Sequence, residues 1–330
     1  MKHNSNTDFM AESKYGLLLH YLKGMQSGEG NNWSGGLPAV SWNECVNAFD
    51  VKKFAENVVT SGAGFVVFTA VQNSGYPCAP SAKYDKYCGP GYCSERDLIS
   101  EIADELAKHD IKTMVYFPAC APMVVPEIIE KLDYIYNGKS YDETGYSPNN
   151  YRLFRDKWFD IVLEYSCRWG DKISGWWIDG CGDIWSGGSI WNNESLSEFS
   201  AALKKGNPNA VVAFNAQNLH PYPYEWVTQG IVHAWNDVED YTTGESFVMN
   251  VTPFERWING IQWNMTIYLG ESWADPAVKY SNEVWIEFMR KVFDKRGSIM
   301  FDACLRRDGT INPEQLKQLS AFKREFKKNR

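Results

Sequence analysis

Short runs of apolar residues alternate along this chain with longer segments in which apolar residues recur every three or four positions. Short apolar runs bounded by turn residues are typical of buried strands, and the wider spacing is typical of helices that pack one face on a sheet. Eight runs fit a strand: 15–20, 64–69, 113–117, 175–178, 211–214, 231–235, 263–267 and 298–301. Strands that alternate with helices predict a parallel sheet with crossover helices.

Local signals predict where the intervening helices begin. Asp50 can cap the N-terminus of a helix that runs to about residue 61. Ser94, with Asp97 three residues later, resembles a capping box in which Asp replaces Glu. The segment that follows has apolar residues at helical spacing: Leu98, Ile99, Ile102 and Leu106. Further helices are expected at 126–133, 151–168, 194–205, 281–295 and 313–327.

Eight strand-and-helix units over 330 residues predict an α/β fold of the (β/α)8 TIM-barrel type. Such a barrel needs about 250 residues, so one barrel with insertions accounts for the whole chain, 1–330, with its core at about 14–325. No linker, repeat or low-complexity tract marks a domain boundary. The polar stretch 137–150 is expected to be a surface insertion.

Composition and charge exclude several kinds of partner. The net charge of −8 argues against nucleic acid, because binding to phosphates needs clustered Lys and Arg, and the only basic cluster is 323–330. No apolar run approaches the length of a membrane span, and residues 1–10 lack the apolar core of a signal peptide. We expect a protein without a membrane partner, cytoplasmic as given, or secreted or periplasmic if a signal peptide was removed. The sequence leaves the oligomeric state open.

The cysteines and histidines give no pattern of a metal or cofactor site. Cys78, Cys88 and Cys93 share one loop, and their spacing is not that of a zinc site. Free thiols and a loop disulfide both remain compatible with it. The other five Cys are expected to be small core residues. No His-Glu-x-x-His segment, dinucleotide-type glycine loop or Gly-x-Ser-x-Gly elbow is present, so no cofactor is expected.

The segment 173–180, Ile-Ser-Gly-Trp-Trp-Ile-Asp-Gly, points most directly to chemistry. Its apolar run ends in Asp179, and the carboxyl ends of strands carry the active sites of parallel barrels. Aromatic residues beside a carboxylate suit a sugar, because an indole face can cover the C–H side of a pyranose while the acid acts at the anomeric carbon. The alternative is that Asp179 only caps the following turn.

Several segments in order resemble the α-L-fucosidase family of retaining glycoside hydrolases. Residues 14–20, Lys-Tyr-Gly-Leu-Leu-Leu-His, resemble the family's first strand, which ends in a sugar-binding His. Further similar segments are 49–50, 63–70, 81–84, 96–98, 112–117, 173–180 and 308–315. The resemblance spans about residues 14 to 325 and implies a TIM barrel with Asp179 as the nucleophile. The chain is too short for the C-terminal β-sandwich that many members carry.

Retaining glycosidases need a second carboxyl group as acid/base. By resemblance it should lie after the nucleophile, in a variable region. Here Val238-Glu239-Asp240-Tyr241 follows the sixth strand and is similar to a family segment, and Glu239 is the first choice. Burial beside Trp235 would raise the pKa of a carboxyl there. The alternatives are Asp240, Glu245 and Glu271. Where the family has a Trp-Glu pair, this chain has Ile261-Gln262, which removes one candidate.

Sugar recognition departs from the family pattern. Gln72 and Asn73 stand where the family usually has a His-His pair, and amides change the arrangement of donors and acceptors for sugar hydroxyls. His20 and Tyr116 are expected to contact the sugar, with His20 as a buried structural residue the alternative. The candidate walls of the pocket, each of which could instead pack in the core, are Trp33, Trp42, Trp177 and Trp235.

The sequence therefore predicts a retaining exo-glycosidase, similar to an α-L-fucosidase, that acts on an oligosaccharide or glycoconjugate. Two alternatives remain. The substitutions at Gln72 and Asn73 favour a related enzyme for another sugar. The loss of the Trp-Glu pair favours a barrel that binds glycans without cleaving them.

Overall fold

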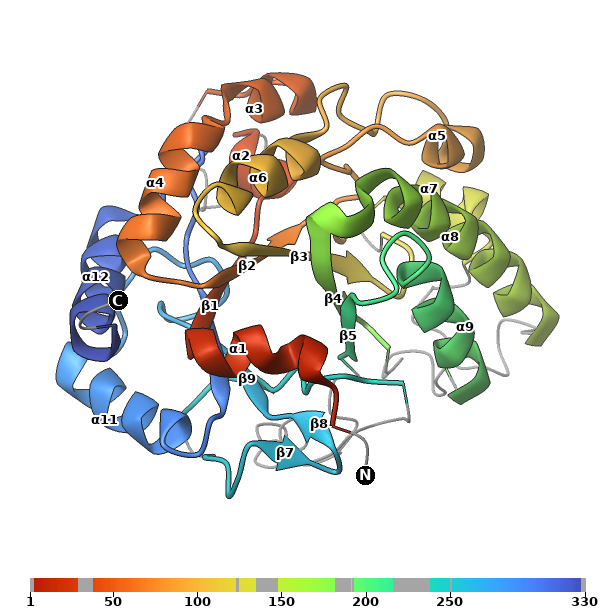
Figure 1. The fold of residues 1–330 in the computed structure, drawn as a ribbon. Helices are drawn as coiled ribbons and strands as arrows, with labels where there is room; N and C mark the ends of the chain where they lie inside the picture. The colour runs from red at the N-terminus through yellow and green to blue at the C-terminus, as the bar shows by residue number, and fades with distance from the viewer. Residues whose placement is uncertain are drawn as a thin grey trace.

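Eight parallel strands form one curved sheet in the order β5-β4-β3-β2-β1-β10-β9-β6 (Figure 1). The structure is a computed structural model, and it describes residues 3–28, 38–122, 125–134, 148–181, 191, 193–215, 238–249 and 251–327. The strands are β1 (Tyr15–Leu19), β2 (Phe65–Thr69), β3 (Lys112–Pro118), β4 (Ile173–Asp179), β5 (Val211–Phe214), β6 (Glu245–Ser246), β9 (Asn264–Tyr268) and β10 (Ser298–Asp302). A separate antiparallel pair joins β7 (Trp257–Ile258) to β8 (Ile261–Gln262).

The segment just before β6 links the two ends of the sheet. The Asp240 N–H donates to the Val212 carbonyl of β5 at 2.8 Å, and the Asp240 carbonyl accepts from the Gln262 N–H at 3.0 Å. The Thr242 N–H in turn donates to the Gln262 carbonyl at 3.0 Å. These bonds bring β5 near β9, so the sheet curls into the α/β barrel of TIM type that the sequence predicts.

Helices surround the sheet (Figure 1). They are α2 (Lys23–Gln26), α3 (Trp42–Ala48), α4 (Val51–Ser61), α5 (Ala82–Cys88), α6 (Leu98–Ala107), α7 (Pro126–Lys131), α8 (Pro148–Trp169), α9 (Asn193–Leu203), α11 (Asn282–Phe293) and α12 (Pro313–Phe326). The short 3-10 turns are η1 (Ser5–Thr7) and η4 (Gly170–Lys172). None of the helices in the described ranges is long and apolar enough to cross a bilayer.

The alternation of side chains along each strand divides the core into two layers. One set of strand residues packs inside the barrel, and the other packs between the sheet and the helices. The inner set includes Leu18, Val67, Met114, Tyr116, Trp177, Val211, Ala213 and Met300. The barrel is therefore filled by side chains and offers a ligand space only beyond the strand ends.

Helix α1 (Asp8–Ser13) lies across one end of the barrel (Figure 1). It directly precedes β1, so this is the N-terminal end of the parallel strands. Met10 is fully buried in the inner cluster, and the Phe9 ring meets Phe65 edge-on at 5.5 Å. Helix α1 covers the centre of this end, and active sites of such barrels lie at the other end, beyond the carboxyl ends of the strands.

Most predicted elements are confirmed. Seven of the eight expected strands are present, while the one expected at 231–235 lies outside the described residues. All the expected helices are present as well. The capping box at Ser94 is wrong, because Asp97 is the N-cap of α6 and accepts from the Ser100 N–H at 3.0 Å. Within the expected insertion, 148–150 already belong to α8, and 137–147 lie outside the described residues.

The three cysteines of the loop are free thiols in separate surroundings. The Cys78 Sγ lies 3.5 Å from the Thr69 carbonyl oxygen, and the Cys93 Sγ lies 4.0 Å from the Tyr165 hydroxyl. Burial raises the pKa of the Cys88 and Cys93 thiols to about 12. The expectation that the other cysteines lie in the core holds for Cys45, Cys120 and Cys181; Cys167 is exposed, and Cys304 is half-buried.

The turn into β6 predicts a sharp effect of Gly244→Ala. Gly244 has φ +62°, and an added methyl would overlap the Asn264 carbonyl oxygen and come within 2.7 Å of the Met265 Cα. Backbone strain and overpacking together should lower the free energy of unfolding by roughly 3 kcal/mol. Gly91 has φ +95° with open space around it, so Gly91→Ala should cost only about 1 kcal/mol. Urea unfolding of both variants measures the difference; equal losses would contradict this account of the turn.

Candidate active site

Polar side chains from most of the strands meet at the carboxyl end of the barrel. Because the strands are parallel, the residues that close them or follow them share this end, and hydrogen bonds bring Tyr116 and Glu245 to the same place. They are His20 after β1, Gln72 after β2, Tyr116 within β3, Asp179 closing β4, Asn215 after β5, Glu245 opening β6 and Asp302 closing β10. The interactions among these residues define the candidate active site.

The carboxylate of Asp179 is held by three hydrogen-bond donors. Its Oδ2 accepts the hydroxyl proton of Tyr116. Its Oδ1 accepts from the Gly180 N–H and from the Asn215 Nδ2, both at 2.9 Å. The group is only half-buried, so its orientation comes from these bonds and it still faces the open end of the barrel.

A single nitrogen of Asn215 connects Asp179 to Glu245. The Asn215 Nδ2 donates to the Glu245 Oε2 at 2.5 Å and to the Asp179 Oδ1 at 2.9 Å. These two distances limit the separation of the two carboxyl oxygens to about 5.4 Å or less. The Thr243 hydroxyl donates to the Asn215 Oδ1 at 3.4 Å, which is consistent with this orientation of the amide.

The environment of Glu245 favours its protonated form. Burial and then the nearby charge of Asp179 raise the pKa of the Glu245 carboxyl to about 7. The hydrogen bond from Asn215 and the proximity of His20 act in the opposite direction on this pKa. Near neutral pH the site therefore pairs a carboxyl that can give up a proton with an anchored carboxylate.

His20 is tied to the neighbouring strand β10. Its Nδ1 lies 2.7 Å from the Asp302 Oδ1, and both side chains are buried. The second oxygen of Asp302 accepts from the Ala274 N–H at 2.5 Å. The His20 ring also packs edge-on against Tyr116 at 5.9 Å and near Trp273 at 6.2 Å. His20 thus has a fixed orientation beside Glu245.

The predicted aromatic walls lie in different places. Trp177 is 3% exposed and stacks on Tyr116 at 5.2 Å, so it supports the floor of the site. Trp42 is buried and its Nε1 donates to the Pro77 carbonyl at 2.9 Å, so it anchors the loop after β2. Trp33 and Trp235 lie outside the described residues.

The two amides after β2 are half-buried. Gln72 reaches the site, because its Nε2 donates to the Tyr116 hydroxyl oxygen at 2.7 Å. Asn73 follows it in the same turn, where the Gly75 N–H donates to the Gln72 carbonyl at 2.9 Å. Of the two, Gln72 is the one whose side chain is bonded to the residues around Asp179.

The remaining acidic candidates are engaged elsewhere. The Glu239 Oε1 accepts from the Phe214 N–H of β5 at 3.1 Å. The Asp240 Oδ2 accepts from the Val212 N–H at 2.8 Å and from Lys204 at 2.7 Å, and its Oδ1 accepts from the Asn4 side chain at 2.6 Å.

Glu271 is exposed in the turn after β9, where its N–H donates to the Asp275 side chain at 3.3 Å. Glu245 shares a hydrogen-bond donor, the Asn215 Nδ2, with Asp179.

Three residues near the site were not predicted from the sequence: Asn215, Asp302 and Trp273. Asn215 and Asp302 stand directly after the apolar runs 211–214 and 298–301. The rule that drew attention to Asp179, a polar residue closing a buried strand, would have found both. Trp273 packs against Tyr268 at 5.2 Å and Phe247 at 6.4 Å, and no local pattern marks it.

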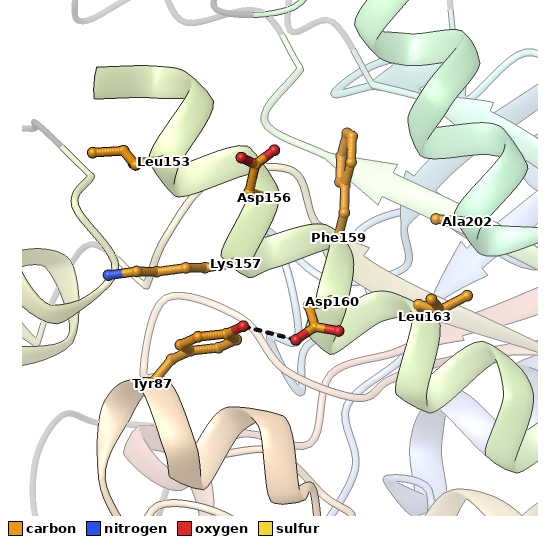
Figure 2. Close-up of a pocket in the computed structure, with 8 residues that line it drawn as sticks. All are labelled: Tyr87, Leu153, Asp156, Lys157, Phe159, Asp160, Leu163 and Ala202. Atoms are coloured by element: carbon orange, nitrogen blue, oxygen red, sulfur yellow. Dashed lines mark hydrogen bonds between the residues drawn. The ribbon is translucent and has the colours of Figure 1, made fainter. Parts of the chain in front are cut away.

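A groove on the outer surface between α5, α8 and α9 lacks these features (Figure 2). It has a cavity volume of about 400 Å³ and exposes the side chains of Leu153 and Leu163. Its Asp160 accepts from the Tyr87 hydroxyl at 2.7 Å and from Lys83 at 2.8 Å. The groove has no counterpart of the Asp179–Glu245 pair, so the barrel end remains the candidate active site.

Comparison with known proteins agrees with this fold and identifies the family. A model of the alpha-L-fucosidase family matches residues 7–329. The chain belongs to the alpha-L-fucosidase family of glycoside hydrolases. A putative alpha-L-fucosidase of Caenorhabditis elegans is 33% identical over 69 residues, a match that covers 21% of this chain and 14% of that relative.

Two solved structures illustrate the range of similar folds. A family 29 alpha-L-fucosidase from Bacteroides thetaiotaomicron, trapped as a covalent intermediate, aligns with a TM-score of 0.66 at 16% identity over 99% of this chain and 76% of that one. The endo-fucoidan hydrolase MfFcnA4 of family 107 aligns with a TM-score of 0.70 at 14% identity over 99% of this chain and 54% of that one. Both alignments show a shared barrel fold.

The raised pKa of Glu245 predicts a pH-dependent gain in stability for Glu245→Gln. The folded carboxyl keeps its proton up to about pH 7, whereas the unfolded one releases it near 4.5. Between these values the folded state binds more protons, so the wild-type free energy of unfolding falls as pH rises and then levels off. Gln cannot ionise, so the variant does not share this loss. From pH 5 to pH 8 its free energy of unfolding should rise relative to that of the wild type by up to about 3 kcal/mol.

Urea unfolding at both pH values measures this gain. The control is Glu287→Gln, which replaces an exposed carboxylate and should give nearly the same difference at each pH. A constant or shrinking difference for Glu245→Gln would show that the folded carboxyl is not protonated near neutral pH.

Proposed function

We propose that this chain is a retaining exo-glycosidase in which Asp179 is the nucleophile and Glu245 is the acid/base. The observation that carries the proposal is the shared donor, Asn215, between the anchored carboxylate of Asp179 and the half-buried carboxyl of Glu245. The Asp179 Oδ1 and the Glu245 Oε2 are at most about 5.4 Å apart, a limit that is compatible with the carboxyl separation of about 5–5.5 Å in retaining enzymes and lies below that of inverting ones.

In the first step, an oxygen of Asp179 forms a bond to the anomeric carbon while the glycosidic C–O bond breaks. Glu245 gives its proton to the leaving oxygen, which departs as an alcohol. The pKa of about 7 keeps this proton available near neutral pH. The product of the step is a glycosyl ester on Asp179 and a carboxylate at Glu245.

In the second step, Glu245 takes a proton from water, whose oxygen attacks the anomeric carbon and releases Asp179. The ester has no negative charge, so it no longer raises the pKa of Glu245 as the carboxylate of Asp179 does. The same residue is therefore a better base in the intermediate than in the free enzyme.

The choice of Glu245 over Glu239 rests on what each carboxyl group contacts. Glu239 and Asp240 accept backbone N–H groups of β5 and so act as parts of the barrel closure. A proton donor must reach the substrate oxygen, and Glu245 is beside Asp179 at the barrel end.

The proposed substrate is a terminal α-L-fucoside of an oligosaccharide or glycoconjugate. Family membership supports it, and the Bacteroides relative was trapped with a fluorinated fucosyl fluoride. Gln72 and Asn73, in place of the family's His pair, keep a different terminal sugar as the second candidate.

Asp179→Asn should abolish turnover of an aryl α-L-fucoside without unfolding the protein, because an amide cannot form the glycosyl ester. The assay uses a panel of aryl glycosides, with proton NMR to read the anomeric configuration of the first product. Retention that disappears in the variant supports the mechanism. If only another glycoside is hydrolysed, and that hydrolysis is lost in the variant, the enzyme acts on a different sugar. Inverted product, or full activity of Asp179→Asn, would contradict the proposal.

Glu245→Ala should lower kcat/KM by about 10² to 10⁴ for a fucoside with a poor leaving group and much less for a highly activated one. Azide should restore turnover and give a fucosyl azide, because a small anion can enter the space of the lost carboxylate. Glu239→Gln serves as the matched variant and should need no azide. If azide restores the turnover of Glu239→Ala while the kcat/KM of Glu245→Ala is unaffected, the acid/base role belongs to Glu239.

The pH profile is a separate prediction. The first step needs protonated Glu245, so kcat/KM should fall about tenfold per pH unit above roughly pH 7. In Glu245→Ala, assayed with the highly activated fucoside, this alkaline limb should be absent. A limb that persists in the variant would assign it to another group.

A further inference from the structure

We propose that Gln72 is a positioning residue for the nucleophile: its amide directs the hydroxyl of Tyr116 toward Asp179. The inference builds on the proposed role of Asp179 and gives Gln72 a task other than binding the sugar. It concerns a residue that this chain has where the family pattern has histidine.

The direction of the hydrogen bonds follows from the number of protons. Tyr116 has one hydroxyl proton, and an ionised carboxylate can only accept, so the proton lies toward the Asp179 Oδ2. The group that Gln72 presents to the hydroxyl oxygen at 2.7 Å must then be its NH2. Burial, together with the charge of Asp179, holds the pKa of Tyr116 well above its usual value, so the hydroxyl keeps its proton.

The backbone around Gln72 is fixed relative to Tyr116. The Ala70 N–H donates to the Tyr116 carbonyl at 3.1 Å, and the Gly75 N–H closes the turn on the Gln72 carbonyl. The Tyr84 hydroxyl donates to the Gly75 carbonyl at 2.8 Å and pins the far side of that turn. Gln72 is thus held at a set distance from the Tyr116 ring, whose other contacts include the stacked Trp177.

The hydrogen bonds from Gln72 to Tyr116 and from Tyr116 to Asp179 matter because the two oxygens of Asp179 are held differently. Oδ1 has two donors, Gly180 and Asn215, whereas Tyr116 is the donor recorded for Oδ2. A hydroxyl can rotate, and it will turn toward any acceptor that competes for its proton. The NH2 of Gln72 directs the hydroxyl proton away from position 72, and the structure places that proton on Asp179, so Gln72 sets the orientation of the nucleophile through Tyr116.

Substitutions at position 72 separate this role from sugar binding. Gln72→Met keeps the length without the hydrogen bond, and Gln72→Glu offers an acceptor that draws the Tyr116 proton away from Asp179. We expect kcat/KM to fall about tenfold in Gln72→Met and further in Gln72→Glu, with KM little changed. In the double variant Gln72→Met with Tyr116→Phe, kcat/KM should match that of Tyr116→Phe alone within about twofold, because both changes interrupt the same series of hydrogen bonds.

Ser74→Ala is the matched control in the same turn. The Ser74 hydroxyl has no hydrogen-bond partner among the described residues, so its removal should leave kcat/KM unchanged. If the losses in kcat/KM of Gln72→Met and Tyr116→Phe multiply in the double variant, the two residues act independently and the proposal is overturned. So would a loss confined to KM that vanishes with a substrate lacking one ring hydroxyl, since that pattern identifies a sugar contact.

A readout that needs no turnover distinguishes this proposal from the proposed function. The buried hydroxyl proton of Tyr116 should give a downfield proton NMR signal that is absent in Tyr116→Phe. We expect this signal to shift in Gln72→Met and to shift or disappear in Gln72→Glu. An unchanged signal in both variants overturns the positioning role, whether or not the protein cleaves a glycoside. Full turnover by Asp179→Asn would instead overturn the proposed function and leave the NMR result standing.

Discussion

The geometry of the candidate active site depends on one amide nitrogen that donates to two acids. Asn215 contacts Asp179 and Glu245 at once, and so fixes both the distance and the relative orientation of the pair. Both side chains are half-buried, and burial together with the nearby charge of Asp179 raises the pKa of the Glu245 carboxyl to about 7. In the proposed mechanism this difference in protonation divides the two roles, and the amide keeps the two groups close together.

The barrel itself could be predicted because seven of its eight strands carry their own signal. Apolar runs such as 64–69 and 113–117 are long enough to read locally, and their regular alternation with helices leaves few alternatives. Strand β6 has only two residues, Glu245 and Ser246, so it gave no such pattern. It is specified by pairing with β9, a contact between segments that local periodicity cannot reveal.

The site was predictable at the strand ends and ambiguous in the loops. Asp179 closes a clear strand, so its position follows from the sequence. Glu239, Asp240 and Glu245 lie within one short segment and are equivalent as residue types. What distinguishes them is the partner each one meets, and those partners belong to other strands. The backbone N–H groups of β5 engage the first two, and the Asn215 side chain engages the third.

The hydrogen bond between Asn4 and Asp240 links the start of the chain to the segment that leads into β6. Asp240 is five residues before Glu245. The turn that contains Asn4 lies at the N-terminal end of the barrel, and the candidate active site lies at the opposite end. Processing, tagging or trimming of the first residues would therefore loosen the support of Glu245 from the opposite end of the molecule. Changes at the N-terminus would then alter the position of Glu245 relative to Asp179 without changing any residue of the candidate active site.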